Sequence, residues 1–184
     1  MPHQGKLKLN TEGSFNKQNG KLGIGGILRN EAIGFVMSFS IPIDCSSNNG
    51  AELKAIKFGY EWCINKVITN FMVKIDSTVI RDMLQNKKLD NNILRKEVED
   101  LTDILEKNNA FVNHCFSEAN QVADWFAKEA TTSTEGIIHT DFRQVPRATK
   151  GPFFMDMWKR WILRKGNDWA TEDEEGHVGV YCGG

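Results

Sequence analysis

The N-terminal part of the chain contains three β-type runs of apolar residues, with polar breaks between them. In residues 6–14, leucines alternate with lysines before a glycine turn, and residues 22–29 and 33–43 form two further runs. The breaks contain Asn19-Gly20 and Asn30. Since the connections are short, the pattern predicts an antiparallel meander of three strands.

From residue 46 onward, segments with a helical period alternate with segments typical of strands. The polar residues 46–49 supply capping side chains for a helix that continues to about residue 66. Further strands are predicted at 70–76 and 110–116, and further helices at 78–86, 93–107 and 118–130. This order of elements predicts an α/β fold in which a five-stranded mixed sheet is flanked by helices.

The pattern changes after residue 131. Residues 135–152 show no clear period, whereas residues 153–164 place aromatic and basic side chains at near-helical spacing. We therefore expect a domain at 1–131 and a C-terminal extension at 132–184, with a candidate amphipathic helix at 153–164. Such a helix could bind a membrane surface, nucleic acid or a protein partner; packing on the domain or a partner is the favoured interpretation.

Composition excludes some classes of function. The 184 residues are 40% hydrophobic and 26% charged, with a net charge of -1, so a polyanion would have to be held by local basic groups or metal ions. No apolar run is long enough for a membrane span, and the polar N-terminus does not resemble a secretory signal. The four cysteines form no Cys-x-x-Cys pair and are expected to be free thiols. We therefore expect an intracellular protein, nuclear or cytoplasmic.

Four acidic residues stand out by their positions. Glu12 follows the first predicted strand, Glu52 lies in the first turn of a helix, Asp76 ends a strand, and Asp124 interrupts an apolar helical segment. Two-metal hydrolysis of phosphodiesters needs carboxylates that converge on two ions about 3.5–4 Å apart. Because Mg²⁺ prefers oxygen ligands, acids on rigid elements suit that chemistry.

Each of these acids also has an ordinary explanation when it is taken alone. Glu52 could favour the positive end of a helix dipole, and Asp76 could cap the next helix. Asp124 could face solvent, and Glu12 could be a turn residue. The signal is that all four coincide with the ends or faces of predicted elements.

Five short stretches carry a more specific pattern, in a fixed order along residues 6 to about 131. They are Leu9-Asn10-Thr11-Glu12-Gly13-Ser14, Gly25-Gly26-Ile27-Leu28-Arg29-Asn30, Asn48-Asn49-Gly50-Ala51-Glu52-Leu53, Ile75-Asp76-Ser77 and Glu118-Ala119-Asn120-Gln121-Val122-Ala123-Asp124. In these stretches the chain resembles the ribonuclease H domain that is common in plant genomes as a retroelement-derived, reverse-transcriptase-associated module. A weaker similarity continues to Trp158.

The resemblance implies a ribonuclease H-like fold and a metal-dependent endonuclease that cuts the RNA strand of RNA–DNA hybrids, with Mg²⁺ or Mn²⁺ as cofactor. Glu52, Asp76 and Asp124 match three of the four metal-binding catalytic residues, and Glu12 occupies the fourth position, where the family has Asp.

The resemblance also assigns nucleic-acid contacts. Asn48 and Asn49 match amides that touch the nucleic-acid backbone, although helix capping is the favoured explanation for them, and Asn120 matches a polar position beside the last carboxylate. The expected partner is therefore an RNA–DNA hybrid or another nucleic acid, and the C-terminal extension could bind a protein.

The glutamate at position 12 puts catalysis in question. Its side chain is longer than aspartate by roughly 1.5 Å, and a misplacement of about 1 Å can lower a rate on the order of a hundredfold. We expect a severely weakened or silent nuclease. The alternatives are a domesticated, inactive binding module and a scaffold whose C-terminal extension carries the function. Converging carboxylates should also raise one another's pKa values and make the folded state responsive to divalent cations.

Overall fold

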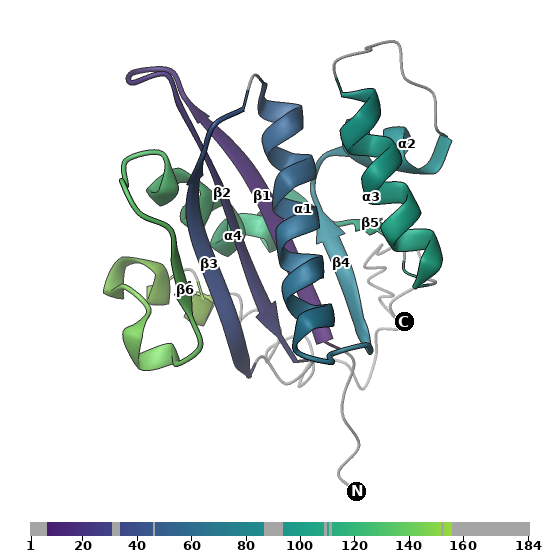
Figure 1. Cartoon of the computed structure of the whole chain (residues 1–184). Coiled ribbons are helices and arrows are strands. Elements are labelled where there is room, and N and C mark those ends of the chain that lie inside the picture. The colour runs from purple at the N-terminus through teal and green to yellow at the C-terminus, as the bar shows by residue number, and fades with distance from the viewer. Residues whose placement is uncertain are drawn as a thin grey trace, which may run out of the picture.

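The computed structural model of the chain describes residues 7–30, 34–45, 47–86, 94–108, 110, 112–151 and 153–155. The strands are β1 (Leu7–Asn16), β2 (Lys21–Arg29), β3 (Phe35–Ile43), β4 (Phe71–Ile75), β5 (Val112–His114) and β6 (Ile137–His139). The helices are α1 (Asn48–Asn65), α2 (Thr78–Asn86), α3 (Arg95–Lys107), α4 (Ser117–Ala130) and the 3₁₀ turn η1 (Phe142–Gln144) (Figure 1).

The strands form one mixed sheet in the order β5-β4-β1-β2-β3-β6. Strands β1, β2 and β3 pair antiparallel, which confirms the predicted meander, whereas β4 pairs parallel with both β1 and β5. The expected α/β class and mixed sheet are therefore confirmed. The register of β1 and β4 pairs Asn10 with Lys74, so two residues further along, Glu12 and Asp76 lie side by side.

The predicted strand count of five was wrong, because β6 adds a sixth strand within a segment that shows no sequence period. Three residues of β6 pair antiparallel with Ser38 to Ser40 of β3. A strand this short has no room for a repeating pattern, and its formation depends on the free backbone groups at the edge of β3.

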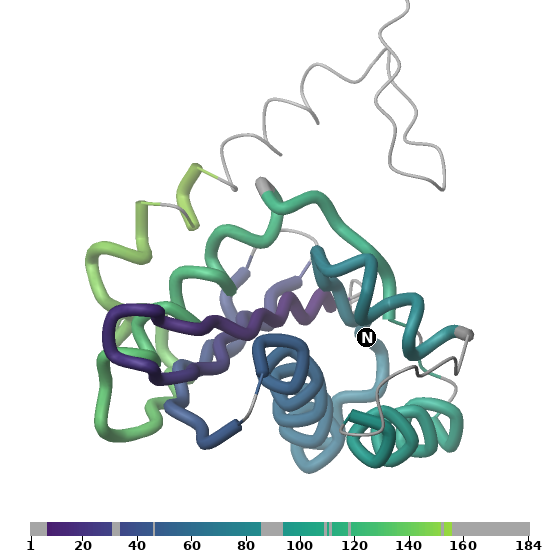
Figure 2. Tube along the Cα trace, turned by 90° about the horizontal axis from the view of Figure 1, so that it is seen from above, coloured from purple at the N-terminus to yellow at the C-terminus, as the bar shows by residue number. Residues whose placement is uncertain are grey.

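The helices cover both faces of the sheet. Helices α1 and α3 lie on one face and α4 on the other (Figure 2). Two glycines permit the close approach of α1 and α4: a Cβ on Gly13 would lie 2.6 Å from the Ala51 carbonyl carbon, and a Cβ on Gly25 would lie 2.6 Å from that of Phe126. Gly13 of β1 and Gly25 of β2 therefore serve the close packing of the helices on the sheet.

Residues after 131 pack on the domain as far as the structure describes them. Val145 and Phe153 are 3% and 4% exposed and join Ile27, Val122 and Phe126 in a hydrophobic cluster on the α4 face. The proposed domain boundary stays a prediction, but residues 137–155 contact the sheet and α4. Of the expected amphipathic helix at 153–164, residues 153–155 are helical and the rest lies outside the described residues.

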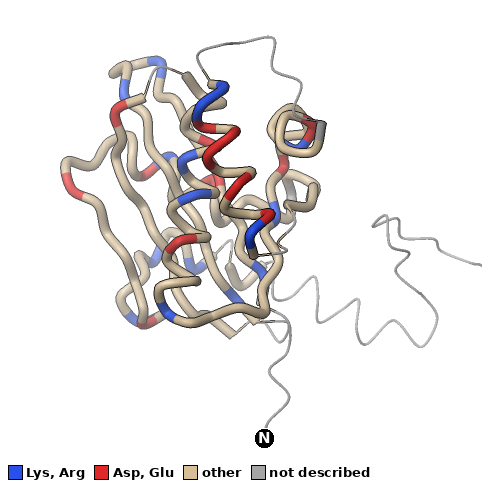
Figure 3. Tube along the Cα trace, turned by 45° about the vertical axis from the view of Figure 1, so that its right-hand side comes forward, with Lys and Arg blue, Asp and Glu red and all other residues tan. Residues whose placement is uncertain are grey.

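The described residues agree with the broad expectations from composition. Cys45, Cys63 and Cys115 are free thiols, and Cys182 lies outside the described part. No described helix is both long and apolar enough for a transmembrane segment. Lys and Arg are spread over several elements, and acidic residues lie along helix α3 (Figure 3). The charge distribution therefore offers no broad basic surface on the described elements.

Helix α1 has a well-defined cap at each end. The side chain of Ser47 accepts a hydrogen bond from the Gly50 backbone at 3.1 Å, so Ser47 rather than the neighbouring asparagines is the N-cap. At the other end, Val67 donates to the Ile64 carbonyl and Ile68 donates to the Cys63 carbonyl, both at 2.9 Å. These two bonds define a Schellman motif, in which the position of Val67 normally holds glycine.

Val67 is strained, since its φ is 59° and its side chain is 84% exposed. The left-handed conformation costs an L-residue about 1–2 kcal/mol, and the greater freedom of glycine in the unfolded chain offsets roughly 0.4–1 kcal/mol. Val67→Gly should therefore raise the free energy of unfolding by roughly 0.5–1 kcal/mol, measured by urea denaturation. Val67→Ala keeps the Cβ atom and should gain less than half of this. An equal gain from alanine would contradict the strain explanation.

Candidate functional site

The four predicted carboxylates come from four elements that meet beside the middle of β1. Glu12 lies within β1 and pairs with Gly25 of β2, and Asp76 directly follows β4. Glu52 is in α1, whose first turns pass over Gly13, the residue after Glu12. Asp124 is in α4, which lies against Gly25. The structure therefore brings together acids that are up to 112 positions apart in the sequence.

Glu12 is the electrostatic centre of this group. Burial raises its pKa to about 9, and the increase is reinforced by a hydrogen bond with Asp76 and by the negative charges of Asp76, Glu52 and Asp124. A hydrogen bond that raises the pKa is one that protonated Glu12 donates. At neutral pH the carboxyl group of Glu12 is therefore protonated and shares its proton with Asp76.

Glu52 is 9% exposed, and it is the second carboxylate of the group with a strongly raised pKa. Burial raises its pKa to about 7, a hydrogen bond with Ser77 opposes this change, and the charge of Asp76 adds to it. The Asn48 side chain donates to Glu52 Oε1 at 3.1 Å. As expected from the sequence, neighbouring acids contribute to the raised pKa values of Glu12 and Glu52.

Asp124 forms an ion pair with a lysine of its own helix. Lys128 Nζ lies 2.6 Å from Asp124 Oδ2, four residues further along α4, and both side chains are partly exposed. Within the described ranges, no three His, Cys, Asp or Glu side chains converge closely enough to form a ready-made metal site. A cation would therefore have to draw these side chains inward.

The residues nevertheless fit a hard divalent cation by their chemistry. All four are carboxylates, the oxygen donors that Mg²⁺ and Mn²⁺ take. Two of them carry pKa values that are raised by burial and further by the neighbouring negative charges, and a cation would compensate those charges. The site therefore fits in donor type and charge, while its side chains are arranged for the state without metal.

The three predicted nucleic-acid contacts have different environments. Asn48 is exposed and Asn49 half-buried, both in the first turn of α1 beside Glu52. Asn120 is 1% exposed and its Nδ2 donates to Glu12 Oε2 at 2.8 Å and to the Thr11 carbonyl at 3.1 Å. The amide of Asn120 thus contacts the first carboxylate, and in this arrangement it is not accessible to a nucleic acid.

Several residues of the site were missed at the level of sequence. Lys128 had a usable signal, since it follows Asp124 at i+4 on a helix. Ser77 also had one, because its hydroxyl accepts from the Ile80 backbone at 3.3 Å and so caps α2 in place of Asp76. Asn10 and Arg29, which lie beneath the cluster, had no local signal.

The imidazole ring of His114 is another side chain that could take part in acid–base chemistry. It lies in β5, half-buried, with its ring edge-on to Phe116 at 6.0 Å between centroids. This environment indicates a structural role for the ring. His3 and His177 lie outside the described residues, and His139 is buried beside Ser38.

The raised pKa of Glu12 predicts a stability that falls with pH. The folded state holds the proton more tightly than the unfolded chain, so this contribution is complete below about pH 4.5 and is lost as pH rises toward 9. Glu12→Gln can accept from Asn120 and donate to Asp76 without ionising. It should therefore flatten the pH dependence and stabilise the chain at pH 8 by roughly 2–4 kcal/mol, given about 1.4 kcal/mol per pKa unit.

Thermal and urea denaturation from pH 5 to 9 measure this effect. Glu99→Gln is the matched control, since Glu99 is exposed on α3, and it should leave the pH profile unchanged. If Glu12→Gln kept the slope of the unmodified chain, Glu12 would not be the titrating group.

The comparisons with known proteins agree with this geometry. The sequence model of the family described as Reverse transcriptase-like matches residues 10–130, which include all four carboxylates. A protein of Arabidopsis thaliana with the name "Putative ribonuclease H protein" is 29% identical over 141 residues, which cover 76% of this chain and 23% of that protein. The chain thus spans about a quarter of the length of this relative.

Solved structures share the fold. A ribonuclease H1 isolated from compost by a metagenomic approach is 24% identical with a TM-score of 0.62, covering 70% of this chain and 96% of its own. The ribonuclease H1 of Halobacterium salinarum is 22% identical with a TM-score of 0.62, covering 68% and 97%. The compost enzyme in complex with an RNA/DNA hybrid also has a TM-score of 0.62, at 23% identity, covering 69% and 97%. The chain belongs to the Reverse transcriptase-like family and has the ribonuclease H fold.

Proposed function

We propose that the chain is a nucleic-acid-binding domain of the ribonuclease H type that hydrolyses RNA in RNA–DNA hybrids weakly, with Mg²⁺ or Mn²⁺. The observation that carries this proposal is the group of four carboxylates around Glu12, with raised pKa values at Glu12 and Glu52. The shared fold of the hybrid-bound compost enzyme supports the substrate class. The Arabidopsis relative supports the plant origin that we propose for the domain, and the Reverse transcriptase-like family model supports the proposed derivation from a retroelement.

In this proposal Glu12, Glu52, Asp76 and Asp124 hold the divalent cations. Bound cations of this kind activate a water molecule and stabilise the leaving oxygen in phosphodiester hydrolysis. The chain's own residues set the conditions for binding: Glu12 must lose the proton it shares with Asp76, and Asp124 must leave Lys128. Both requirements weaken cation binding at neutral pH, since protons and Lys128 compete for the same oxygens.

The glutamate at position 12 is the proposed cause of weak catalysis. Its longer side chain reaches Asn120, where Oε2 accepts at 2.8 Å, and this contact directs the carboxyl group toward α4. Catalytic groups need placement within about 0.5 Å, which an added methylene group exceeds. An aspartate at this position would stay closer to β1.

One observation favours a second candidate function, an inactive module that binds nucleic acid. In the part of the chain that the structure covers, no three acidic, histidine or cysteine side chains converge as a metal site requires. A binding module would keep the fold and the affinity for a hybrid without needing that convergence. Cleavage assays separate the two functions.

Glu12→Asp should increase cleavage of a labelled RNA–DNA hybrid on the order of a hundredfold over the unmodified chain, because a shift of about 1 Å has an effect of that size. Asp76→Asn should abolish the activity of both chains, since it removes an oxygen ligand. Initial rates at saturating Mg²⁺ measure the change.

A matched control is Glu99→Gln, which leaves the carboxylate group intact and should cleave at the unmodified rate. If neither the unmodified chain nor Glu12→Asp cleaves while both bind the hybrid, the inactive module is the correct function. If neither binds the hybrid, both functions are wrong.

Divalent cations should also stabilise the folded chain. At a tenfold excess over the dissociation constant, a ligand that binds only the native state adds about 1.4 kcal/mol, or roughly 3–6 °C in melting temperature. The shift should be larger at pH 8 than at pH 6, because fewer protons compete for Glu12 and Glu52. Differential scanning fluorimetry with Mg²⁺ measures it. An equal shift in Asp76→Asn would place the bound cation elsewhere.

A further inference from the structure

A line of buried polar side chains lies beneath the carboxylates and ends at Glu12. Arg29 Nη2 donates to Asn10 Oδ1 at 3.0 Å, and Asn10 Nδ2 donates to Asn120 Oδ1 at 3.0 Å. Asn120 Nδ2 then donates to Glu12 Oε2 at 2.8 Å. Arg29, Asn10 and Asn120 are 1%, 2% and 1% exposed, so the line passes through the interior from β2 through β1 to α4.

The order of donors and acceptors in this line follows from its first member. A guanidinium group has only donors, so the Asn10 oxygen must face Arg29 and the Asn10 amino group must face Asn120. The oxygen of Asn120 must then accept, which turns its amino group toward Glu12. The Thr11 carbonyl accepts from the same amino group at 3.1 Å and fixes the orientation from the other end.

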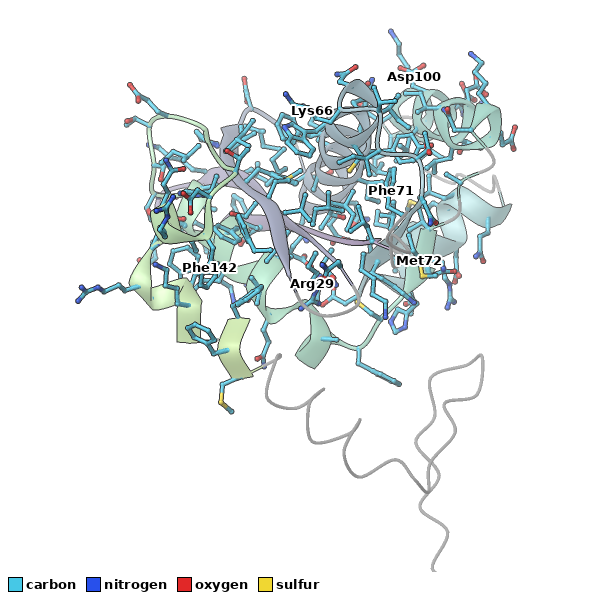
Figure 4. All side chains as sticks on the ribbon, turned by 90° about the horizontal axis from the view of Figure 1, so that it is seen from below. Arg29, Lys66, Phe71, Met72, Asp100 and Phe142 are labelled. Carbon is cyan, nitrogen blue, oxygen red and sulfur yellow. The ribbon has the colours of Figure 1, made fainter. Side chains whose placement is uncertain are left out.

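Arg29 lies where it can fix this order of donors and acceptors. It closes β2, and Figure 4 shows it among the side chains in the interior of the molecule. Its Nη2 also donates to the Ala119 carbonyl of α4 at 3.4 Å, one residue before Asn120. Burying a charged guanidinium and two amides is costly when apolar residues could fill the same space.

We propose that Arg29 is a positioning residue for the carboxylate site: through Asn10 it fixes the orientation of the Asn120 amide, which holds Glu12 in place. The line of three residues thus determines where the first carboxylate lies. Its effect on Glu12 stands by itself, and its effect on cation binding rests on the proposed function. Two separate measurements therefore distinguish the failure of one from the failure of the other.

The variant Asn10→Asp tests the order of donors directly. Its carboxylate has nearly the same size and still accepts from Arg29, but it cannot donate to Asn120 Oδ1. The new carboxylate faces Asn120 Oδ1 and repels it. The Asn120 amide then turns to donate to this carboxylate, against the orientation that the Thr11 carbonyl favours, and Glu12 loses its donor. Arg29→Lys is the conservative control, because it keeps a buried cation that can only donate.

The first measurement is made on the full chain without metal. In the unmodified chain and in Arg29→Lys, NMR should show a nuclear Overhauser effect between the side-chain amide protons of Asn120 and the methylene protons of Glu12. In Asn10→Asp this signal should be lost while the remaining spectrum stays folded. If the signal persists in Asn10→Asp, the proposal is wrong.

The second measurement is the dissociation constant of Mn²⁺ alone, by titration calorimetry. Asn10→Asp and Asn120→Ala should each weaken Mn²⁺ binding about tenfold, as is usual when a residue that orients a metal ligand is changed. Arg29→Lys should stay within about threefold. Asn10→Asp also adds a negative charge near Glu12, so its result is compared with that of Asn120→Ala, which breaks the same line of contacts without changing the charge.

The double variant Asn10→Asp with Asn120→Ala should be no worse than either single variant, because both act through one line of contacts. Additive losses, or unchanged Mn²⁺ binding in Asn10→Asp, would overturn the link to the metal site. If the unmodified chain binds no Mn²⁺ while the NMR result is as expected, the positioning of Glu12 stands and the proposed function fails.

Discussion

The distance at which two helices approach the sheet determines what this molecule can do. Gly13 follows Glu12 in β1 and faces α1, and Gly25 is paired with Glu12 in β2 and faces α4. A side chain at either glycine would meet the backbone of the helix above it. The two bare backbone positions therefore let both helices bring their acids, Glu52 and Asp124, to the one carboxylate on β1.

That approach brings acids together without a compensating cation, and the protein manages the repulsion by protonation and hydrogen bonding. Glu12 keeps a proton, Asn120 and Asn48 donate to carboxylate oxygens, and Lys128 pairs with Asp124. The proton on Glu12 and the lysine at Asp124 are alternatives to a metal ion at the same oxygens, whereas the two amides orient the carboxylates. Stability, pH and cation binding are therefore linked through the same few atoms.

The sequence predicted the elements of the domain and the positions of its acids well, for reasons that differ between the two. Alternation and helical periods are local, and the strands and helices found between residues 7 and 130 follow them closely. The grouping of Glu12, Glu52, Asp76 and Asp124 was predictable because each sits at a defined place on such an element. The family resemblance supplied their order.

Other features had no such local signal. Strand β6 exists because β3 offers an unpaired edge. Val67 adopts a left-handed backbone conformation because α1 ends in a Schellman motif. Valine occupies the position of this motif that normally holds glycine. In the sequence, Asn10 is an ordinary polar residue and Arg29 is the end of a strand. Their contacts with each other and with the Ala119 carbonyl depend on the packing of α4 against the sheet.

By itself, the sequence determined which segments are strands and helices and which carboxylates could meet, because these depend on the spacing of residues along the chain. Only the tertiary structure decided how the carboxylates are held: which one keeps a proton, which one pairs with a lysine, and which buried amides face Glu12. Burial, charge repulsion and the direction of a hydrogen bond depend on neighbours in space, and here the neighbours Glu12 and Asp124 are 112 positions apart in the sequence.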